Sequence, residues 1–293
     1  MLDDVVDYLV CPICAGEMAV AGATLRCPDG HSFDIARQGY ANLLPGGARP
    51  HAADTAAMIQ AREEFLGAGH FAALADLLAD RAAASVRGAG GCVVDVGAGT
   101  GYFLATVLNR LSDHVGLAVD LSKHAARRAA RAHPRIGAAV CDAWRPLPVR
   151  SGAASLVLNV CAPRNGAEFR RVLRPGGALL VATPAADHLV ELVEPLGLLS
   201  VDPRKGERVG AALDDHFETI GHTAYETGLR LARHEVEALV RMGPSAYHVD
   251  PAELADRVAA LPEPVAVTAS FTVTTMKRRY HRPRLPARDG PGS

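Results

Sequence analysis

Short apolar runs recur through the middle of the chain, and amphipathic stretches of helical length separate them. Runs of four to seven apolar residues between helices are typical of strands that are buried on both faces of a parallel sheet. The pattern therefore predicts an α/β fold with a doubly wound parallel sheet, whose ligand lies beyond the carboxyl ends of the strands. The runs that we interpret as strands cover residues 92–96, 115–119, 138–141, 154–160 and 178–183.

The remaining periodicity predicts the helices and two further strands. Ser122 is a good N-cap for the second crossover helix, and Pro175 and two glycines end the helix before the fifth strand. Residues 265–275 alternate between apolar and hydroxyl side chains, which indicates a long final strand, and residues 217–232 include a sixth. The predicted helices cover residues 53–66, 71–86, 102–111, 122–132, 168–173, 233–242 and 251–260, with another that starts at 187.

The first apolar run leads into Gly97, Gly99 and Gly101. Such glycines allow a tight turn and let a ligand approach the main chain, and the next helix points its N-terminal amides there. Dinucleotide enzymes favour G-x-G-x-x-G, so this G-x-G-x-G after Asp95 makes a nicotinamide-dependent dehydrogenase a distant alternative. The pattern resembles motif I of the S-adenosylmethionine (AdoMet) methyltransferases.

Two further acids support a cofactor site at this turn. Asp120 ends the next apolar run, 19 residues beyond Gly101, where an acid can accept both ribose hydroxyls. Asp142 follows the third run, where such enzymes hold the adenine. A bare turn that binds nothing is the alternative, and three acids on successive strands argue against it.

A second motif precedes the sheet. Cys11, Cys14, Cys27 and His31 have the spacing C-x2-C-x12-C-x3-H, and three thiolates with one imidazole suit a tetrahedral Zn²⁺. The alternatives are a redox C-x-x-C, which would follow a strand in a βαβ unit, and chance thiols. Asp29 is a less favoured fourth ligand than His31. Four protein ligands close the site, so we expect one structural zinc per chain.

Composition limits the partners and the location of the protein. The net charge is −1, so an RNA substrate needs a local basic patch. Arg127, Arg128 and Arg131 are more typical of a solvated helix face than of an RNA site, and the basic tail after residue 276 fits a phosphate contact or a disordered end equally. We predict a cytoplasmic protein with no membrane segment, because no run approaches a span and the acidic N-terminus lacks a signal peptide. Its cysteines are then thiols or metal ligands.

The zinc motif, the stretches that follow it and the glycine turn together resemble the 23S rRNA guanine-N1 methyltransferases along nearly the whole chain. Residues 159–165 and 242–245 resemble the branch of this family that occurs in macrolide-producing actinomycetes. The resemblance implies a doubly wound, seven-stranded, Rossmann-like AdoMet-dependent methyltransferase fold with a small N-terminal zinc-binding module. The stretches that carry it are 33–45, 58–62 and 68–71, followed by the methyltransferase core.

The resemblance also implies an activity and further site residues. The activity is methylation of N1 of one guanine in a hairpin loop of 23S rRNA near the peptide exit tunnel, which gives resistance to 16-membered macrolides. Phe71, Phe103, Leu104 and His188 match family positions on AdoMet, and Cys11, Cys14, Cys27 and His31 match its zinc ligands. A homodimer with a shared basic cleft is implied as well. The predicted parts are a zinc-binding RNA-recognition module at 1–45, a linker or lid at 46–69, a methyltransferase domain at 70–276 and a flexible basic tail at 277–293.

Several points stay open at this level. A small-molecule methyltransferase with a structural zinc and a non-catalytic zinc-dependent rRNA-binding protein are the alternative functions, although a pure binder has no need of the glycine turn. The residue that accepts the N1 proton is unknown, and Asp214, Asp215 and Asp250 are the candidates. We expect the target base at the end of the fourth strand, along residues 159–163.

Overall fold

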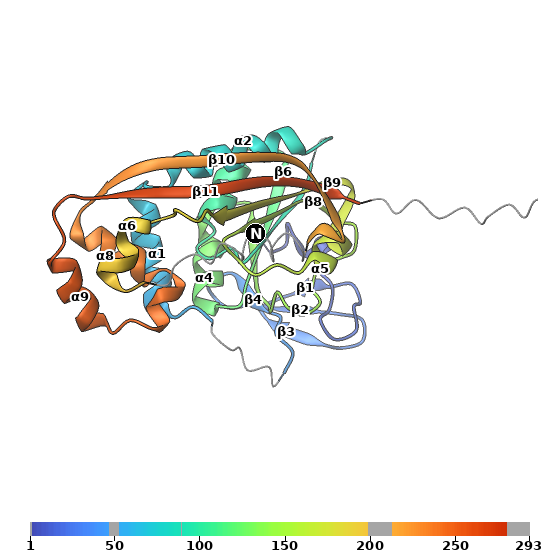
Figure 1. The fold of residues 1–293 in the computed structure, drawn as a ribbon. Helices are drawn as coiled ribbons and strands as arrows, with labels where there is room; N and C mark the ends of the chain where they lie inside the picture. The colour runs from blue at the N-terminus through green and yellow to red at the C-terminus, as the bar shows by residue number, and fades with distance from the viewer. Residues whose placement is uncertain (1, 47–52, 89, 199–212, 280–293) are drawn as a thin grey trace, which may run out of the picture.

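The computed structural model describes residues 2–46, 53–88, 90–198 and 213–279 (Figure 1). At its centre is an eight-stranded sheet in the order β10-β11-β9-β8-β5-β6-β7-β4. Neighbours from β9 to β4 are parallel, whereas β11 is antiparallel to both β9 and β10. The predicted doubly wound sheet is therefore confirmed, with one strand more than the seven that were expected. The strands are β4 (Tyr40–Asn42), β5 (Gly91–Val96), β6 (His114–Asp120), β7 (Ile136–Val140), β8 (Ala154–Val160), β9 (Leu173–Pro184), β10 (Phe217–Leu231) and β11 (Val265–Arg278).

Most predicted helices form close to their expected bounds. Ser122 caps its helix as predicted, since its Oγ accepts from the amides of His124 and Ala125. Three boundaries were wrong for local reasons. Thr55 caps the first helix by accepting from Met58 N, so that helix begins at Ala56 and not at residue 53. Asn165 caps a helix that begins two residues early, and a turn in which the amide of His188 bonds to Ala185 O delays the helix expected at 187. The helices are α1 (Ala56–Gly67), α2 (Ala72–Ser85), α3 (Tyr102–Arg110), α4 (Lys123–Ala132), α5 (Gly166–Val172), α6 (Val190–Leu196), α8 (Arg233–Arg241) and α9 (Pro251–Ala259).

The fifth strand also starts earlier than predicted. β9 begins at Leu173, which pairs with Ala154, and regular pairing resumes only at Ala178 opposite Leu156. The residues between them bulge outward, with Gly176 at a φ of +78°. The expected break at residues 175–177 is therefore a bulge within the strand.

The two faces of the sheet are covered by different parts of the chain. Along β5, Val93 points into a core that it shares with α2, α3 and α4, whereas Val94 and Val96 point into a second core. Residues of α5 cover part of that second face, and the N-terminal segment covers the rest. Both faces of the central strands are thus dry, as a parallel sheet requires.

The N-terminal segment is fixed to the sheet by its main chain and by its side chains. It contains a small antiparallel sheet of β1 (Ala19–Ala21), β2 (Thr24–Arg26) and β3 (Ser32–Asp34). Leu9, Leu25 and Leu43 are buried in the second core. Main-chain bonds join Leu43 N to Val140 O and Arg150 N to Tyr8 O, and β4 adds a parallel strand beside β7.

A third group of elements gathers at one end of the sheet. Figure 1 shows α1, α6, α8 and α9 clustered where β10 and β11 turn away from the sheet. Helix α1 packs on α8, and α6 packs on β11 and α9. None of the helices in the described ranges is long and apolar enough to cross a membrane. Residues 47–52 of the predicted linker or lid and the tail beyond residue 279 lie outside the described residues.

Candidate active site and zinc centre

The four predicted metal ligands meet at one point of the N-terminal segment. The Sγ atoms of Cys11, Cys14 and Cys27 and a ring nitrogen of His31 lie within 4.8 Å of one another. The separation is 3.6 Å between Cys14 Sγ and Cys27 Sγ and 3.3 Å between Cys27 Sγ and His31 Nδ1. Ligands about 2.0–2.3 Å from a tetrahedral zinc are separated by roughly 3.5–3.8 Å. The residues therefore fit one closed Cys3His zinc site, and Asp29 is not in the group.

Two tight turns bring these ligands together. Cys11 N donates to Gly16 O at 2.8 Å, and Ala15 N donates to Cys11 O at 2.8 Å. On the other side, Cys27 N bonds to His31 O at 3.1 Å. The metal thus joins two turns that main-chain hydrogen bonds close, as in a zinc ribbon.

The glycine turn lies between the carboxyl ends of three neighbouring strands. Gly97 and Ala98 both donate to Val119 O of β6, at 2.8 and 3.2 Å. On the other side, a Cβ on Gly97 would collide with Cβ of Ala162, which follows β8. Gly97 also has a φ of +78°, so a side chain is excluded there by both conformation and space.

Two acidic residues that were predicted to bind the cofactor flank this turn, and they differ in hydrogen bonding. Asp120 accepts from Gly99 N at 2.9 Å and from Ser122 N at 2.8 Å, and each oxygen keeps a lone pair for a hydroxyl. Asp95 is 2% exposed, and its Oδ1 has no hydrogen-bond partner. Burial, together with the charge of Asp120, raises the pKa of Asp95 to about 8. An unpaired buried carboxyl beside an open turn fits a cationic ligand group, such as the ammonium of AdoMet.

An aromatic cluster brings together Phe71 and His188, which are 117 positions apart. The ring of Phe271 on β11 lies 5.3 Å from that of Phe71 and 4.5 Å from that of His188, centroid to centroid. Phe271 pairs with Pro184 at the end of β9, so the cluster sits at the carboxyl edge of the sheet.

His188 has a defined tautomer in this cluster. Its Nδ1 accepts from Ser270 N at 3.2 Å, so the proton resides on Nε2. Burial lowers the pKa of His188 to about 4, which keeps the ring neutral at pH 7. A neutral imidazole with a free Nε2–H can donate one hydrogen bond to an acceptor on a ligand.

The other predicted cofactor residues lie around the same edge. Phe103 is half-buried on the first turn of α3, whereas the Leu104 side chain is fully buried against Gly116. Leu104 can therefore reach a ligand only through its main chain. Asp142 accepts from Trp144 N at 2.9 Å and lines a groove between the loop after β7 and the zinc ribbon. The ligand roles of all these residues stay predictions.

The end of β8 and the turn that follows it contain two more unpaired polar atoms. Asn159 is fully buried, and its Nδ2 donates to Val96 O and Pro163 O, both at 3.0 Å. Its Oδ1 and the Nε of Arg164 are buried without a hydrogen-bond partner. Cys161 adopts a φ of +52° in this turn, a strained conformation of the kind that gathers at functional sites.

Sequence reasoning missed several residues of this edge. The alternation in residues 265–275 put Phe271 on the buried face but gave it no ligand role. Arg62 also approaches the glycine turn, 3.1 Å from a Cβ placed on Gly99. Of the candidate proton acceptors, Asp250 caps α9 by accepting from Ala252 N and Glu253 N. Asp214 and Asp215 are exposed.

The fold and this edge define an AdoMet-dependent methyltransferase that carries a zinc ribbon. The family described as "RlmA, N-terminal", a zinc ribbon, matches residues 9–49, and the family described as "Methyltransferase domain" matches residues 93–177. Both matches contain the motifs that were read from the sequence.

Relatives extend the match to nearly the whole chain. A Micromonospora griseorubida protein assigned as a 23S rRNA (guanine-N1)-methyltransferase is 56% identical over 92% of this chain and 97% of its own length. The Streptomyces fradiae 23S rRNA (guanine(748)-N1)-methyltransferase is 52% identical over 94% of this chain and 99% of its own. A Bacillus subtilis protein assigned to the same activity is 30% identical over 86% and 90%. The chain belongs to the 23S rRNA (guanine-N1)-methyltransferase family.

Replacing Cys14 with serine tests the zinc centre. We expect Cys14→Ser to lower the zinc content from about one ion per chain to nearly none, and to lower the Tm by at least about 5 °C, because the ribbon covers a core face. Metal analysis and a thermal melt measure both. Cys161→Ser, outside the ligand cluster, should keep its zinc. Unchanged zinc in Cys14→Ser would show that the ligand set is wrong.

The unpaired carboxyl of Asp95 predicts proton release on cofactor binding. With its pKa near 8, Asp95 is protonated at pH 7 in the free protein, and a nearby cation favours the charged form. AdoMet binding should therefore release up to about one proton, measured by calorimetry in two buffers of different ionisation enthalpy. Asp95→Asn should abolish the release, whereas Asp113→Asn, exposed at the opposite ends of the strands, should keep it. Equal release in both variants would remove Asp95 from the cofactor site.

Proposed function

We propose that this protein transfers the methyl group of AdoMet to N1 of guanine 748 in 23S rRNA, and that this modification gives resistance to 16-membered macrolides. The observation that carries the proposal is the nearly full-length relation to the Streptomyces fradiae enzyme, which spans both the ribbon and the cofactor edge. An rRNA substrate implies a cytoplasmic location. Bound AdoMet supplies an activated methyl group, so the protein has to bind and align the reactants.

The target base is proposed to bind at the turn after β8. This turn packs against Gly97 through Ala162, and the strand that leads into it pairs with β5, where Asp95 lies opposite Leu158. Guanine presents an acceptor at O6 and a donor at its amino group. The unpaired atoms of the turn, a donor at Arg164 Nε and an acceptor at Asn159 Oδ1, have the complementary chemistry. The base must be unpaired to reach them, which suits a loop guanine.

The groove between the ribbon and the loop after β7 is proposed to contact the RNA around the target. Trp144 is 68% exposed and Ile13 is 56% exposed, two of the five most exposed large apolar side chains described. Their neighbours Arg145 and Pro12 line the groove. Aromatic and arginine side chains at such a surface stack on unpaired bases and pair with phosphates. The module at 1–45 then helps to position the rRNA, and the dimer implied by the family stays a prediction.

Methylation of rRNA tests the proposed function directly. Labelled AdoMet and unmethylated 23S rRNA should give incorporation, and primer extension should stop at guanine 748, because an N1 methyl group blocks Watson–Crick pairing. The Asn159→Asp variant is expected to bind AdoMet but to methylate at least about 100-fold more slowly, since it places a charge in the base site. Bound AdoMet without incorporation into rRNA would favour a small-molecule acceptor instead.

Removal of the exposed indole tests the groove. We expect Trp144→Ala to weaken binding of the 23S rRNA hairpin by about 5- to 100-fold, the usual loss for one stacked base, while AdoMet affinity stays unchanged. Electrophoretic mobility shifts at fixed salt measure the change. Ile220→Ala removes another exposed apolar side chain, 54% exposed, from β10, the edge strand opposite β4, and should have no effect. Equal RNA affinity in Trp144→Ala and the wild type would show that the groove is not part of the RNA-binding surface.

A further inference from the structure

Arg62 of α1 lies directly over the glycine turn. A Cβ placed on Gly99 would be 3.1 Å from its Nη1 and 3.4 Å from its Cδ. The guanidinium also lies close enough to Asp120 to oppose the rise in the pKa of that carboxyl that burial causes. A positive charge is thus held against the main chain where the cofactor is expected.

Two other segments hold this guanidinium in place. Nη1 forms an ion pair with Asp54 Oδ2 at 2.7 Å, and Nη2 donates to Met242 O at 2.7 Å. The carbonyl of Asp54 accepts from Ser122 Oγ at 2.7 Å, and Tyr247 OH donates to Asp54 Oδ1 at 3.4 Å. Both side chains of the ion pair are about a quarter exposed, at 23% and 24%, so solvent and solutes can reach them.

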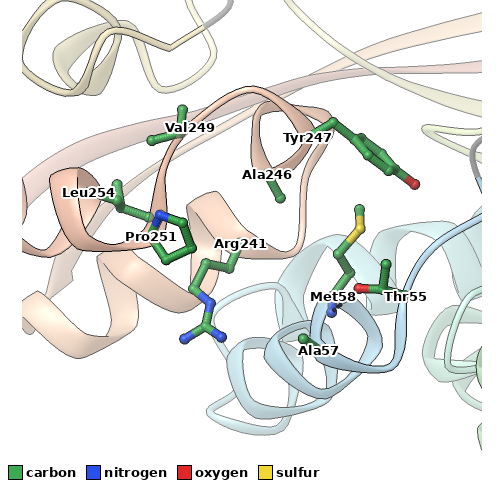
Figure 2. Close-up of a pocket in the computed structure, with 9 residues that line it drawn as sticks. All are labelled: Thr55, Ala57, Met58, Arg241, Ala246, Tyr247, Val249, Pro251 and Leu254. Carbon is green, nitrogen blue, oxygen red and sulfur yellow. Dashed lines mark hydrogen bonds between the residues drawn. The ribbon is translucent and has the colours of Figure 1, made fainter.

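The same segments enclose a separate hollow that can be excluded as the cofactor site. Figure 2 shows Met58 of α1 and Thr55, the N-cap of that helix, on one side, with Tyr247 of the 3-10 helix η2 (Pro244–Tyr247) and Arg241 of α8 around the same space. None of the predicted cofactor residues lines it. The contact that α1 makes through Arg62 is separate from this hollow and is close and polar.

The charges around the edge indicate which ligand group Arg62 can bind. The carboxyl group of Asp95 suits an ammonium group, and that of Asp120 suits hydroxyl groups. The carboxylate of an amino-acid ligand instead needs a cationic side chain. A guanidinium matches a carboxylate in a two-pronged hydrogen-bonded pair. Asp54 already presents that chemical group to Arg62, as a ligand carboxylate would.

We propose that Arg62 binds the carboxylate of the methionine part of AdoMet, and that Asp54 is the competing partner that holds the guanidinium over the turn before the cofactor arrives. The inference rests on the proposed methyl donor but not on the RNA substrate. Arg62 is then a cofactor-binding residue contributed by a helix outside the sheet.

Binding of two cofactor forms without RNA tests this proposal. Calorimetry should show that the wild type binds AdoMet at least about 10-fold more tightly than decarboxylated AdoMet, which keeps the ammonium but lacks the carboxylate. Arg62→Met should weaken the binding of AdoMet by about 10- to 100-fold, the usual loss for a charged hydrogen bond. It should weaken the binding of decarboxylated AdoMet by less than about 2-fold. Arg128→Met, which removes a different ion pair of α1, with Glu63, should change neither.

The Asp54→Asn variant distinguishes a contact of Arg62 with the cofactor from a purely structural role of Arg62 in fastening α1. If Asp54 competes with the cofactor, Asp54→Asn frees Arg62 and leaves AdoMet affinity unchanged or up to about 5-fold tighter. If Arg62 only fastens α1, Arg62→Met and Asp54→Asn weaken both cofactor forms to the same extent, and the proposal is overturned. A wild type that binds neither form would instead refute the proposed methyl donor.

Discussion

The central constraint on this molecule is that its parallel strands are apolar on both faces. Val93 and Val94 are adjacent in β5 and point into different cores, so neither face can be left to water. Helices α2, α3 and α4 cover one face. The other is covered by α5 and by a metal-binding segment that is too small to have a large core of its own. The zinc ribbon therefore covers part of one face of the sheet and is an integral part of the folded core.

With both faces filled, only the carboxyl edge of the sheet is left for chemistry. Among the described residues, four have unpaired buried polar atoms. Three of them, Asp95, Asn159 and Arg164, lie at or just beyond the ends of the adjacent strands β5 and β8. Each leaves a polar atom unbonded at a cost in stability that packing elsewhere must offset. Bound ligands would complete these polar groups, which is why this edge, and not the hollow near α8, is the candidate active site.

Local patterns in the sequence were sufficient for much of this account. The turn at residues 97–101, Asp120 at a strand end, the cap at Ser122 and the four metal ligands all depend on neighbours within about 20 residues, and spacing alone located them. Other features depend on distant pairings. Arg62 bonds to Met242 across 180 positions, Phe271 meets His188 only because β11 runs antiparallel to β9, and β4 becomes an eighth strand only beside β7. Periodicity contains no information about such approaches.

The pairing of β4 with β7 has a consequence for how the chain is made. Tyr40 of β4 lies beside Ala138 of β7, so the ribbon leaves the ribosome almost a hundred residues before the strand that it will accompany. All four metal ligands lie within residues 11–31, so the complete ligand set has emerged while the sheet is still being synthesised. The apolar side chains of Leu9 and Leu25 then stay exposed to solvent until the strands that cover them are synthesised. Synthesis from the N-terminus thus favours an order of events in which the ribbon binds its metal first and the sheet then assembles against it.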